Sequence, residues 1–159
     1  MSIERYVVTP HGLRVLRDRV RQIKEVERPE NVRDIEEAIA HGDLSENAEY
    51  HAAKERQGLL DAELRNYEDK ISRAEVIDPS TLDGDKVVFG ATVMLFNIDT
   101  EEEVTYQIVG IDEADLREKK ISYASPLGRA IIGKEEGDEI AFKAPGGTRN
   151  YEVVEIQFI

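Results

Sequence analysis

The chain has 159 residues, no cysteine and a formal net charge of -13 at pH 7. This length suits one or two small domains, and the missing cysteines exclude a disulfide framework and a thiolate metal site. The acidity excludes nucleic-acid binding through a broad basic face, because that mode needs many Lys and Arg contacts with phosphates. Action on nucleic acid would therefore need a protein partner or a divalent cation as intermediary. Taken alone, the charge is explained by solubility.

No feature of the sequence indicates a membrane or zinc protein. No apolar run approaches the roughly 20 residues that a membrane span needs, and the N-terminus lacks the apolar stretch of a secretory signal. The three histidines stand at spacings that suggest no zinc site. We therefore expect a cytoplasmic protein that makes no membrane contact.

Residues 1–78 have the pattern of a helical hairpin. Thr9 is suited to cap the first helix, with Pro10 at the first helical position, where its missing N–H matters little. An apolar stripe follows at three- and four-residue spacing at Leu13, Leu16, Val20 and Ile23. After Pro29 the stripe resumes in a shifted phase at Val32, Ile35 and Ile39. Because proline removes a helical hydrogen bond, we expect a kink or short break near residues 27–30, with helix on both sides.

The return helix has a cleaner pattern. Its apolar positions alternate four and three apart and form a heptad seam at Ala53, Gln57, Leu60, Leu64, Tyr67, Ile71 and Ala74. Asp78 and Pro79 are expected to end this helix. The two seams can bury against each other only if the helices run antiparallel, as the short turn between them demands. We therefore predict an antiparallel coiled-coil hairpin, roughly 45 Å long at ~1.5 Å per residue.

The tip of this hairpin, residues 41–47, lies in an acidic segment. From Asp34 to Ala53 there are several acidic residues and no Lys or Arg. Asp43 and Glu46 are three apart, a spacing that puts both carboxylates on one side of a helix or tight turn, within reach of one cation. Such oxygen ligands suit Mg²⁺. Two carboxylates make an incomplete site, which would need a partner that already holds a metal and a phosphodiester.

The same spacing has a purely structural explanation. Asp43 as N-cap and Glu46 at the third helical position would form a capping box, with Ser45 as an alternative cap. From the spacing alone, capping is favoured over metal binding.

Residues 79–159 have the pattern of a small β-rich domain. The expected strands cover residues 86–89, 92–96, 104–109, 140–142 and 151–158. Ser125 and Pro126 begin one short helix, which Gly133 ends. The whole chain is thus predicted to be α+β, a helical hairpin followed by an antiparallel sheet of four or five strands with one helix. This half has no nucleophile–base pair and no phosphate loop, so we interpret it as a docking module.

Seven segments of the chain carry a recognisable family pattern. The longest, residues 41–55, is His-Gly-Asp-Leu-Ser-Glu-Asn-Ala-Glu-Tyr-His-Ala-Ala-Lys-Glu. The others are residues 89–93, 108–110, 112–115, 125–126, 132–136 and 145–147. In this order they resemble the GreA/GreB family of bacterial transcript cleavage factors over essentially the whole chain. The resemblance reverses the preference between capping and metal binding, although a cap can also fix the turn that aims the carboxylates.

The resemblance implies a function. The hairpin would enter the secondary channel of RNA polymerase, while the C-terminal domain, similar in fold to FK506-binding proteins, would dock at its rim through the region of Ser125 and Pro126. Asp43 and Glu46 would help to hold a second Mg²⁺ and its attacking water, only in the complex. The polymerase's own active site would then hydrolyse the nascent RNA 3′ end of a backtracked complex, so the chain itself is not an enzyme. We expect it to act as a monomer.

One departure from the family concerns contact with RNA. Members often carry a small basic patch near the tip that helps to hold the displaced RNA, and Lys54 matches one of its positions. Ile39 stands where some members have Arg, and Arg56 or Arg33 are the candidates to replace that charge. The departure weakens the expected RNA contact and favours cleavage of short over long backtracked segments.

Two other classes of function stay open from the sequence. A channel-inserting regulator that inhibits the polymerase without stimulating cleavage would need the hairpin but not both acids. A peptidyl-prolyl isomerase or chaperone is suggested only by the implied fold of residues 80–159. Fold does not confer function, and the few aromatic residues in that half argue against an apolar proline pocket.

Overall fold

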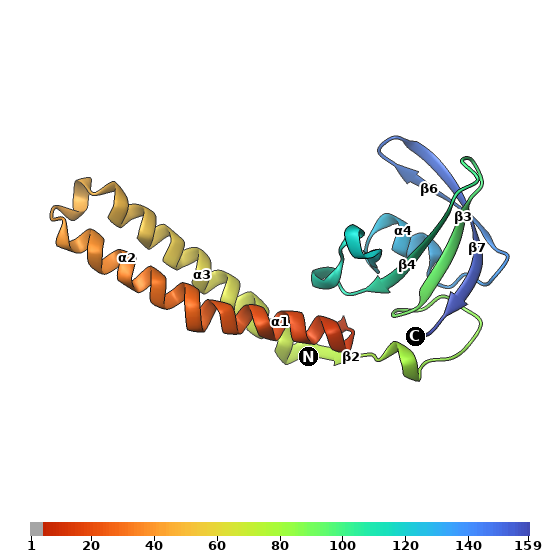
Figure 1. Ribbon diagram of the computed structural model, residues 1–159, viewed down its shortest axis with the longest axis horizontal. Coiled ribbons are helices and arrows are strands. Elements are labelled where there is room, and N and C mark those ends of the chain that lie inside the picture. Colours follow the sequence, from red (N-terminus) through yellow and green to blue (C-terminus); the bar gives the residue numbers. More distant parts are fainter. Residues whose placement is uncertain (1–4) are drawn as a thin grey trace. The chain divides into compact units, whose positions relative to one another are not determined.

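The computed structural model describes residues 5–159, which divide into two compact units (Figure 1). The first unit contains residues 14–74 together with residues 5 and 6, and the second contains residues 7–13 and 75–159. The sequence of the second unit is therefore interrupted by that of the first. None of the helices in the described part is both long and apolar enough to cross a membrane.

Long helices form the predicted hairpin. In chain order they are α1 (Pro10–Gln22), a π turn (Ile23–Glu27), α2 (Arg28–Ala40), a 3-10 turn (Leu44–Glu46) and α3 (Ala48–Arg73). α2 and α3 lie side by side, joined by the turn at the tip of the hairpin (Figure 1). The predicted start of the first helix is confirmed, because the Thr9 hydroxyl accepts a hydrogen bond from the Gly12 N–H at 3.1 Å.

Apolar residues from both arms of the hairpin bury against one another. Ile23, Leu60 and Leu64 form one core cluster, with Val20 and Tyr67 packed against it. These residues belong to the predicted seams, which are confirmed along this stretch. Full burial of one such aliphatic side chain contributes about 2 kcal/mol, so this cluster supplies a large part of the free energy that holds the arms together.

Pro29 does not break the helix near residues 27–30 as we predicted. The irregularity lies earlier, in the π turn, where the Arg28 N–H bonds to the carbonyl of Ile23, five residues back. Proline lacks an N–H, and its ring crowds the carbonyl four residues before it. A wider turn directly ahead of Pro29 relieves this conflict, and α2 then continues the helix from Arg28 without a break.

The π turn also changes which residues of α2 face α3. Val32 and Ile39 were predicted to lie in the seam but are 47% and 50% exposed, so this prediction is wrong. The buried residues of α2 are Asn31 and Ala38. An additional residue in one helical turn rotates all later side chains about the helix axis. The Asn31 amide makes use of its buried position by donating to the Ala53 carbonyl at 2.9 Å.

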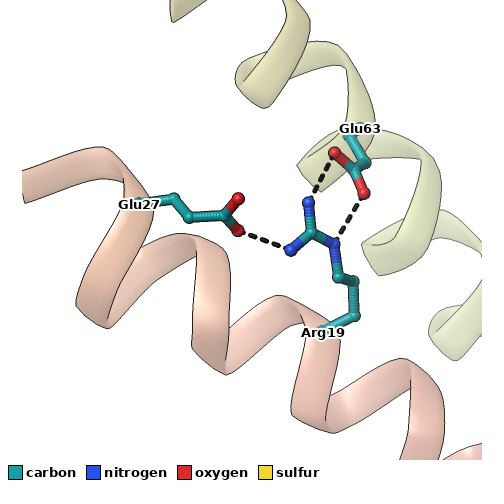
Figure 2. Close-up of polar contacts among 3 residues, drawn as sticks. All are labelled: Arg19, Glu27 and Glu63. Carbon is teal, nitrogen blue, oxygen red and sulfur yellow. Dashed lines mark hydrogen bonds and ion pairs between the residues drawn. The ribbon is translucent and has the colours of Figure 1, made fainter. Parts of the chain in front are cut away.

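A charged cluster joins α1, the π turn and α3 (Figure 2). The Arg19 guanidinium donates to both carboxylate oxygens of Glu63, from Nε at 2.6 Å and from Nη2 at 2.8 Å. Its Nη1 donates to Glu27, the last residue of the π turn. The hydrogen bonds with Glu63 raise the pKa of Arg19, and the same bonds lower the pKa of Glu63. The planar fork of arginine matches a carboxylate, so this cluster fixes the π turn against α3.

The return helix ends earlier than we predicted. α3 stops at Arg73, because Ala74 has an extended backbone (ψ 130°) and begins β2 (Ala74–Val76). β2 pairs with β1 (Tyr6–Val8) in a two-stranded sheet, which supplies hydrogen bonds that a further helical turn would otherwise make. Asp78 and Pro79, expected to end the helix, instead open a short 3-10 turn.

A five-stranded sheet forms the body of the second unit, in the order β5-β4-β3-β7-β6. The strands are β3 (Thr92–Asn97), β4 (Glu103–Val109), β5 (Lys120–Ser122), β6 (Glu139–Ala144) and β7 (Gly147–Gln157). The short helix α4 (Pro126–Ile131) contacts β5 and β6. Its Ile131 is buried in one cluster with Val93, Leu95, Ile108 and Val153 of the sheet. The predicted α+β fold, a helical hairpin and a sheet domain with one short helix, is confirmed.

Two details of the sheet differ from the prediction. β5 was missed, and because it runs parallel to β4 the sheet is mixed rather than wholly antiparallel. Residues 86–89 were predicted as a strand, but only Lys86 makes an isolated bridge, with Glu135. Val87 in this segment is fully buried, so its apolar side chain reflects packing in the core rather than membership of the sheet.

Residues 7–13 are held in the second unit by the buried carboxylate of Glu113. This carboxylate accepts hydrogen bonds from the backbone N–H groups of Thr9 and Gly110, both at 3.1 Å, and from the Thr9 hydroxyl. Gly12 lies so close that a Cβ atom there would collide with Glu113. The free N–H groups of a first helical turn favour a negative charge, so α1 begins against a matched carboxylate.

Replacing Glu63 tests the charged cluster. Glu63→Gln removes the charge that holds Arg19, and we expect the free energy of unfolding to fall by about 1 kcal/mol at pH 7, since both side chains are partly exposed. A lowered folded-state pKa stabilises the fold fully above the ordinary value of 4.5, and this contribution is lost as the pH falls through the lowered pKa. The difference between wild type and variant, measured by urea unfolding, should therefore shrink below about pH 4.5.

The control for this measurement is Glu68→Gln. Glu68 pairs with Lys24 at 2.9 Å, but both side chains are about half exposed, so the variant should lie within about 0.5 kcal/mol of wild type. An equal decrease of the free energy of unfolding in the two variants would contradict a special role for the cluster at Arg19.

Candidate functional site at the hairpin tip

The tip turn begins at the C-terminus of α2. The backbone N–H of His41 bonds to the Ala38 carbonyl at 3.2 Å, and that of Gly42 bonds to Ile39 at 3.1 Å. Gly42 then adopts a φ of +93° with open space around its Cα atom. A side chain is strained at this φ, so glycine is the residue that lets the chain turn away from α2 toward the two acids.

Asp43 caps a short turn and does not cap the return helix. Its Oδ1 atom accepts from the Ser45 N–H at 3.2 Å and from the Ser45 hydroxyl at 2.9 Å. The cap of α3 is Asn47, whose Oδ1 accepts from the Tyr50 N–H at 3.0 Å. The predicted capping box of Asp43 and Glu46 is therefore wrong, and Ser45 is not the alternative cap. Asp43 is too far ahead of the helix, since the 3-10 turn lies between them.

Asp43 and Glu46 line the same open depression at the tip. Its volume is about 480 Å³, and its lining comprises His41, Gly42, Asp43, Glu46, Asn47, Ala48 and Glu49. Both acids are exposed. The Glu46 carboxylate makes no hydrogen bond or ion pair with any residue between 5 and 159, and the Asp43 carboxylate bonds only to Ser45 there. The two carboxylates therefore face solvent together with oxygen atoms available to a ligand.

This arrangement fits part of a cation site. Among the described residues, no group of three or more Asp, Glu, His or Cys side chains is placed to hold a metal. Mg²⁺ commonly takes one or two protein carboxylates and completes its shell with waters and phosphate oxygens. Asp43 and Glu46 suit such a partial role because neither carboxylate is paired with a cation in the described part of the chain.

The cationic residues predicted near RNA do not line the depression. Lys54 is exposed and donates to the Gln57 side chain at 2.8 Å. Arg56 pairs with Glu30 at 3.4 Å and with Asp34 at 3.6 Å, so most of its charge is compensated by α2. Of the two candidates to replace the missing family arginine, Arg56 is thus engaged, whereas Arg33 is exposed.

Two polar residues that tie the tip together were missed in the sequence. Asn47 donates from Nδ2 to the Ala38 carbonyl at 2.7 Å and, more weakly, to that of Gly42 at 3.4 Å. His51, on the first turn of α3, lies with Nε2 at 3.2 Å from the Ser45 carbonyl. An Asn directly before a helical pattern is a cap signal. The Asp-x-x-Glu spacing of a capping box, however, led us to assign the cap to Asp43.

Ser125 and Pro126, predicted to face the polymerase, begin α4 in the second unit. The Ser125 hydroxyl donates to the Ser122 carbonyl at 2.6 Å and accepts from the Gly128 N–H at 3.1 Å. The predicted cap is therefore confirmed, and Pro126 is exposed beside it. Gly128 is required at the first turn, because a Cβ atom would collide with the Ser122 carbonyl oxygen.

Known proteins are similar to this chain along nearly its full length. The family described as "Transcription elongation factor, N-terminal" matches residues 6–76, and "Transcription elongation factor, GreA/GreB, C-term" matches residues 82–158. "Transcription elongation factor GreA" of Brucella canis is 52% identical over 157 residues, which is 99% of this chain and 100% of the relative. The protein of the same name from Brucella abortus strain S19 has the same identity and coverage.

Several solved structures are also similar to this chain. The crystal structure of GreA factor homolog 1 (Gfh1) of Thermus thermophilus is 27% identical, and the alignment covers 97% of this chain and 99% of that one with a TM-score of 0.44.

A pair of glycine substitutions tests the turn geometry. Gly42→Ala should lower the free energy of unfolding by about 1 kcal/mol, because alanine is strained at a φ of +93°. Gly58→Ala should raise it by up to about 1 kcal/mol, since Gly58 lies inside α3 with open space around it. Both are measured by chemical denaturation. A stabilised Gly42→Ala variant would contradict the described turn.

Proposed function

The chain belongs to the GreA/GreB family of transcription elongation factors, and on this premise we propose how it acts. It binds RNA polymerase, inserts the hairpin into the secondary channel and stimulates the polymerase's own hydrolysis of RNA in backtracked complexes. It is not itself the hydrolase. It acts in the cytoplasm, where the polymerase is, and as a monomer.

The observation that carries this proposal is the shared depression of Asp43 and Glu46 at the end of the hairpin. A complete metal site would bind its ion in the free protein, without ligands from a partner. Two exposed carboxylates on a narrow projection are instead suited to complete a metal site whose other ligands belong to another protein. The opposite charge that attracts them is then supplied by the partner's metal and by the surroundings of its channel.

Asp43 and Glu46 take the role of shared ligands for a second Mg²⁺ of the polymerase active site. When bound there, this ion supplies a water activated for in-line attack on the phosphodiester. The protein's own contribution is geometric. It brings two hard oxygen ligands to a fixed place, and the Asp43–Ser45 hydrogen bonds orient one of them.

Contact with the nascent RNA 3′ end is proposed for Lys54, with a lesser part for Arg56. Lys54 is exposed on α3 and pairs only with a neutral amide among the residues described. Arg56 would have to leave Glu30 and Asp34 to reach a phosphate. Lys54 is the one cation at a position of the family's basic patch, and Ile39 stands where some members have Arg. We therefore propose that the hold on displaced RNA is weak and that short backtracked segments are released.

The second unit docks on the rim of the polymerase channel through the surface around Ser125 and Pro126. Pro126 is exposed, and the Ser125 cap together with Gly128 fixes the first turn of α4. A rigid turn of this kind can present the same surface each time it meets its partner.

Cleavage assays with neutral isosteres test the role of the acids. Asp43→Asn and Glu46→Gln keep size and remove charge, and each should lower the rate of RNA cleavage in stalled, backtracked complexes by about 100-fold or more. Polymerase binding should persist, because the rest of the hairpin and the second unit are unchanged. The rates are read from labelled RNA on gels, at several Mg²⁺ concentrations.

The matched control is Glu36→Gln, which neutralises an exposed acid of α2 that does not line the depression. It should cleave at the wild-type rate. A variant of Asp43 or Glu46 that cleaves normally would remove that residue from the metal site. A wild type that binds and only slows the polymerase would replace the proposal by that of an inhibitory regulator.

A further inference from the structure

Asn47 stands where the tip turn meets the return helix. It follows Glu46 directly, has an extended backbone (φ −89°, ψ 100°) and precedes the first residue of α3. Unlike the two acids, it is half-buried. Its side chain is therefore placed between the two helices instead of facing the solvent.

The oxygen and the nitrogen of the Asn47 amide make hydrogen bonds with different helices. The oxygen accepts from the Tyr50 N–H at 3.0 Å and so caps α3. The nitrogen donates to the Ala38 carbonyl at 2.7 Å, in the last turn of α2. The same Ala38 carbonyl also accepts from the His41 N–H at 3.2 Å, and Ala38 is itself almost fully buried. One side chain thus joins the end of one helix to the beginning of the other.

Capping alone does not require asparagine. Asp and Ser cap helices about as well as Asn, but an aspartate has no N–H donor, and a serine side chain is too short to accept from Tyr50 and also reach Ala38 as the amide does. The cross-link to Ala38 needs an acceptor and a donor on one planar group. Asn47 supplies both.

The loop that this cross-link closes carries both acids. Residues 39–46 run from the end of α2 through Gly42, Asp43 and Glu46 to Asn47, and the Asp43 hydrogen bonds reach only to Ser45. The separation of the two carboxylates therefore depends on where the ends of this loop are held and on the contact between His51 Nε2 and the Ser45 carbonyl at 3.2 Å. The Asn47–Ala38 hydrogen bond holds these ends together.

We propose that Asn47 is a positioning residue for the pair Asp43 and Glu46. Its amide sets the spacing of the two carboxylates by closing the tip loop, a role separate from its cap on α3. This inference rests on the proposed function, since it concerns how the acids present themselves to a shared Mg²⁺.

Two substitutions separate the cross-link from the cap. Asn47→Ser keeps an oxygen to cap α3 and loses the donor to Ala38, whereas Asn47→Ala loses both. Asn47→Ser should unfold within about 2 °C of wild type, since the cap is retained. Its maximal cleavage rate should nevertheless fall roughly 10-fold or more, because misplacement of reacting groups by about 1 Å has effects of that size.

The cleavage assay is read in two further ways. The concentration of factor that half-saturates the polymerase should not change, because no docking residue is altered. The Mg²⁺ concentration for half-maximal cleavage should rise, and high Mg²⁺ should restore part of the rate. If Asn47→Ser cleaves within 2-fold of wild type while Asn47→Ala is impaired, only the cap matters and the inference is overturned.

A measurement on the free protein tests the cross-link without the polymerase. By NMR, the Asn47 side-chain amide should be protected from hydrogen exchange in wild type, and the Ser45 and Glu46 backbone amides should exchange faster in Asn47→Ser. Unchanged exchange would overturn the inference even if the cleavage activity is as proposed. If wild type shows the exchange pattern but no stimulated cleavage, the proposed function fails and the positioning role fails with it.

Discussion

The seam between the two arms of the hairpin is the constraint on which the first unit depends. A pair of helices has one buried stripe and no second layer behind it, so each arm can bury side chains only against the other. Large aliphatic residues fill the seam at Ile23, Leu60 and Leu64. Nearer the tip the buried positions are Ala38, Ala53 and the polar Asn31. Order at the tip therefore has to come largely from hydrogen bonds, among them those of Asn47 with Ala38 and of Asn31 with Ala53.

The pairing of acidic with basic side chains also decreases from the base of the hairpin to its tip. Toward the base, Arg19 binds Glu63 and Glu27, so acids and bases compensate one another. Farther along, Arg56 compensates Glu30 and Asp34. The carboxylates of Asp43 and Glu46 have no such partner in the described part of the chain. The negative potential of the hairpin is thus concentrated at its end. There the carboxylates repel one another, and only a bound cation or a basic channel can offset this repulsion.

Sequence patterns predicted the elements that follow one local rule. The heptad seam of α3, the Thr9 cap with Pro10, and the Ser125 cap with Pro126 each depend on residues within a few positions of one another. The errors arose where two signals compete. Pro29 indicated a break, yet the chain widened the preceding turn and so moved Val32 and Ile39 out of the seam. β5 is three residues long and pairs with a neighbour in the sheet, which no local pattern reveals.

The candidate site shows the same limit. Spacing alone placed the cap at Asp43, because Asp and Asn are both good caps and only the structure shows which one precedes the helix. Spacing identified Asp43 and Glu46 as a pair, and family resemblance decided in favour of metal binding over capping. The structure adds that both line one depression. Asn47 escaped notice because its partner at Ala38 lies nine residues away, across the turn.

The hydrogen bonds of Glu113 have a consequence for the order in which the chain is made. Thr9 and Glu113 are 104 positions apart, and residues 14–74 of the first unit are synthesised between them. During translation both arms of the hairpin are therefore complete before Glu113, whose carboxylate binds the first turn of α1, has been synthesised. The second unit therefore cannot close around its own beginning until most of the protein has left the ribosome, while the hairpin needs no residue beyond its own return helix.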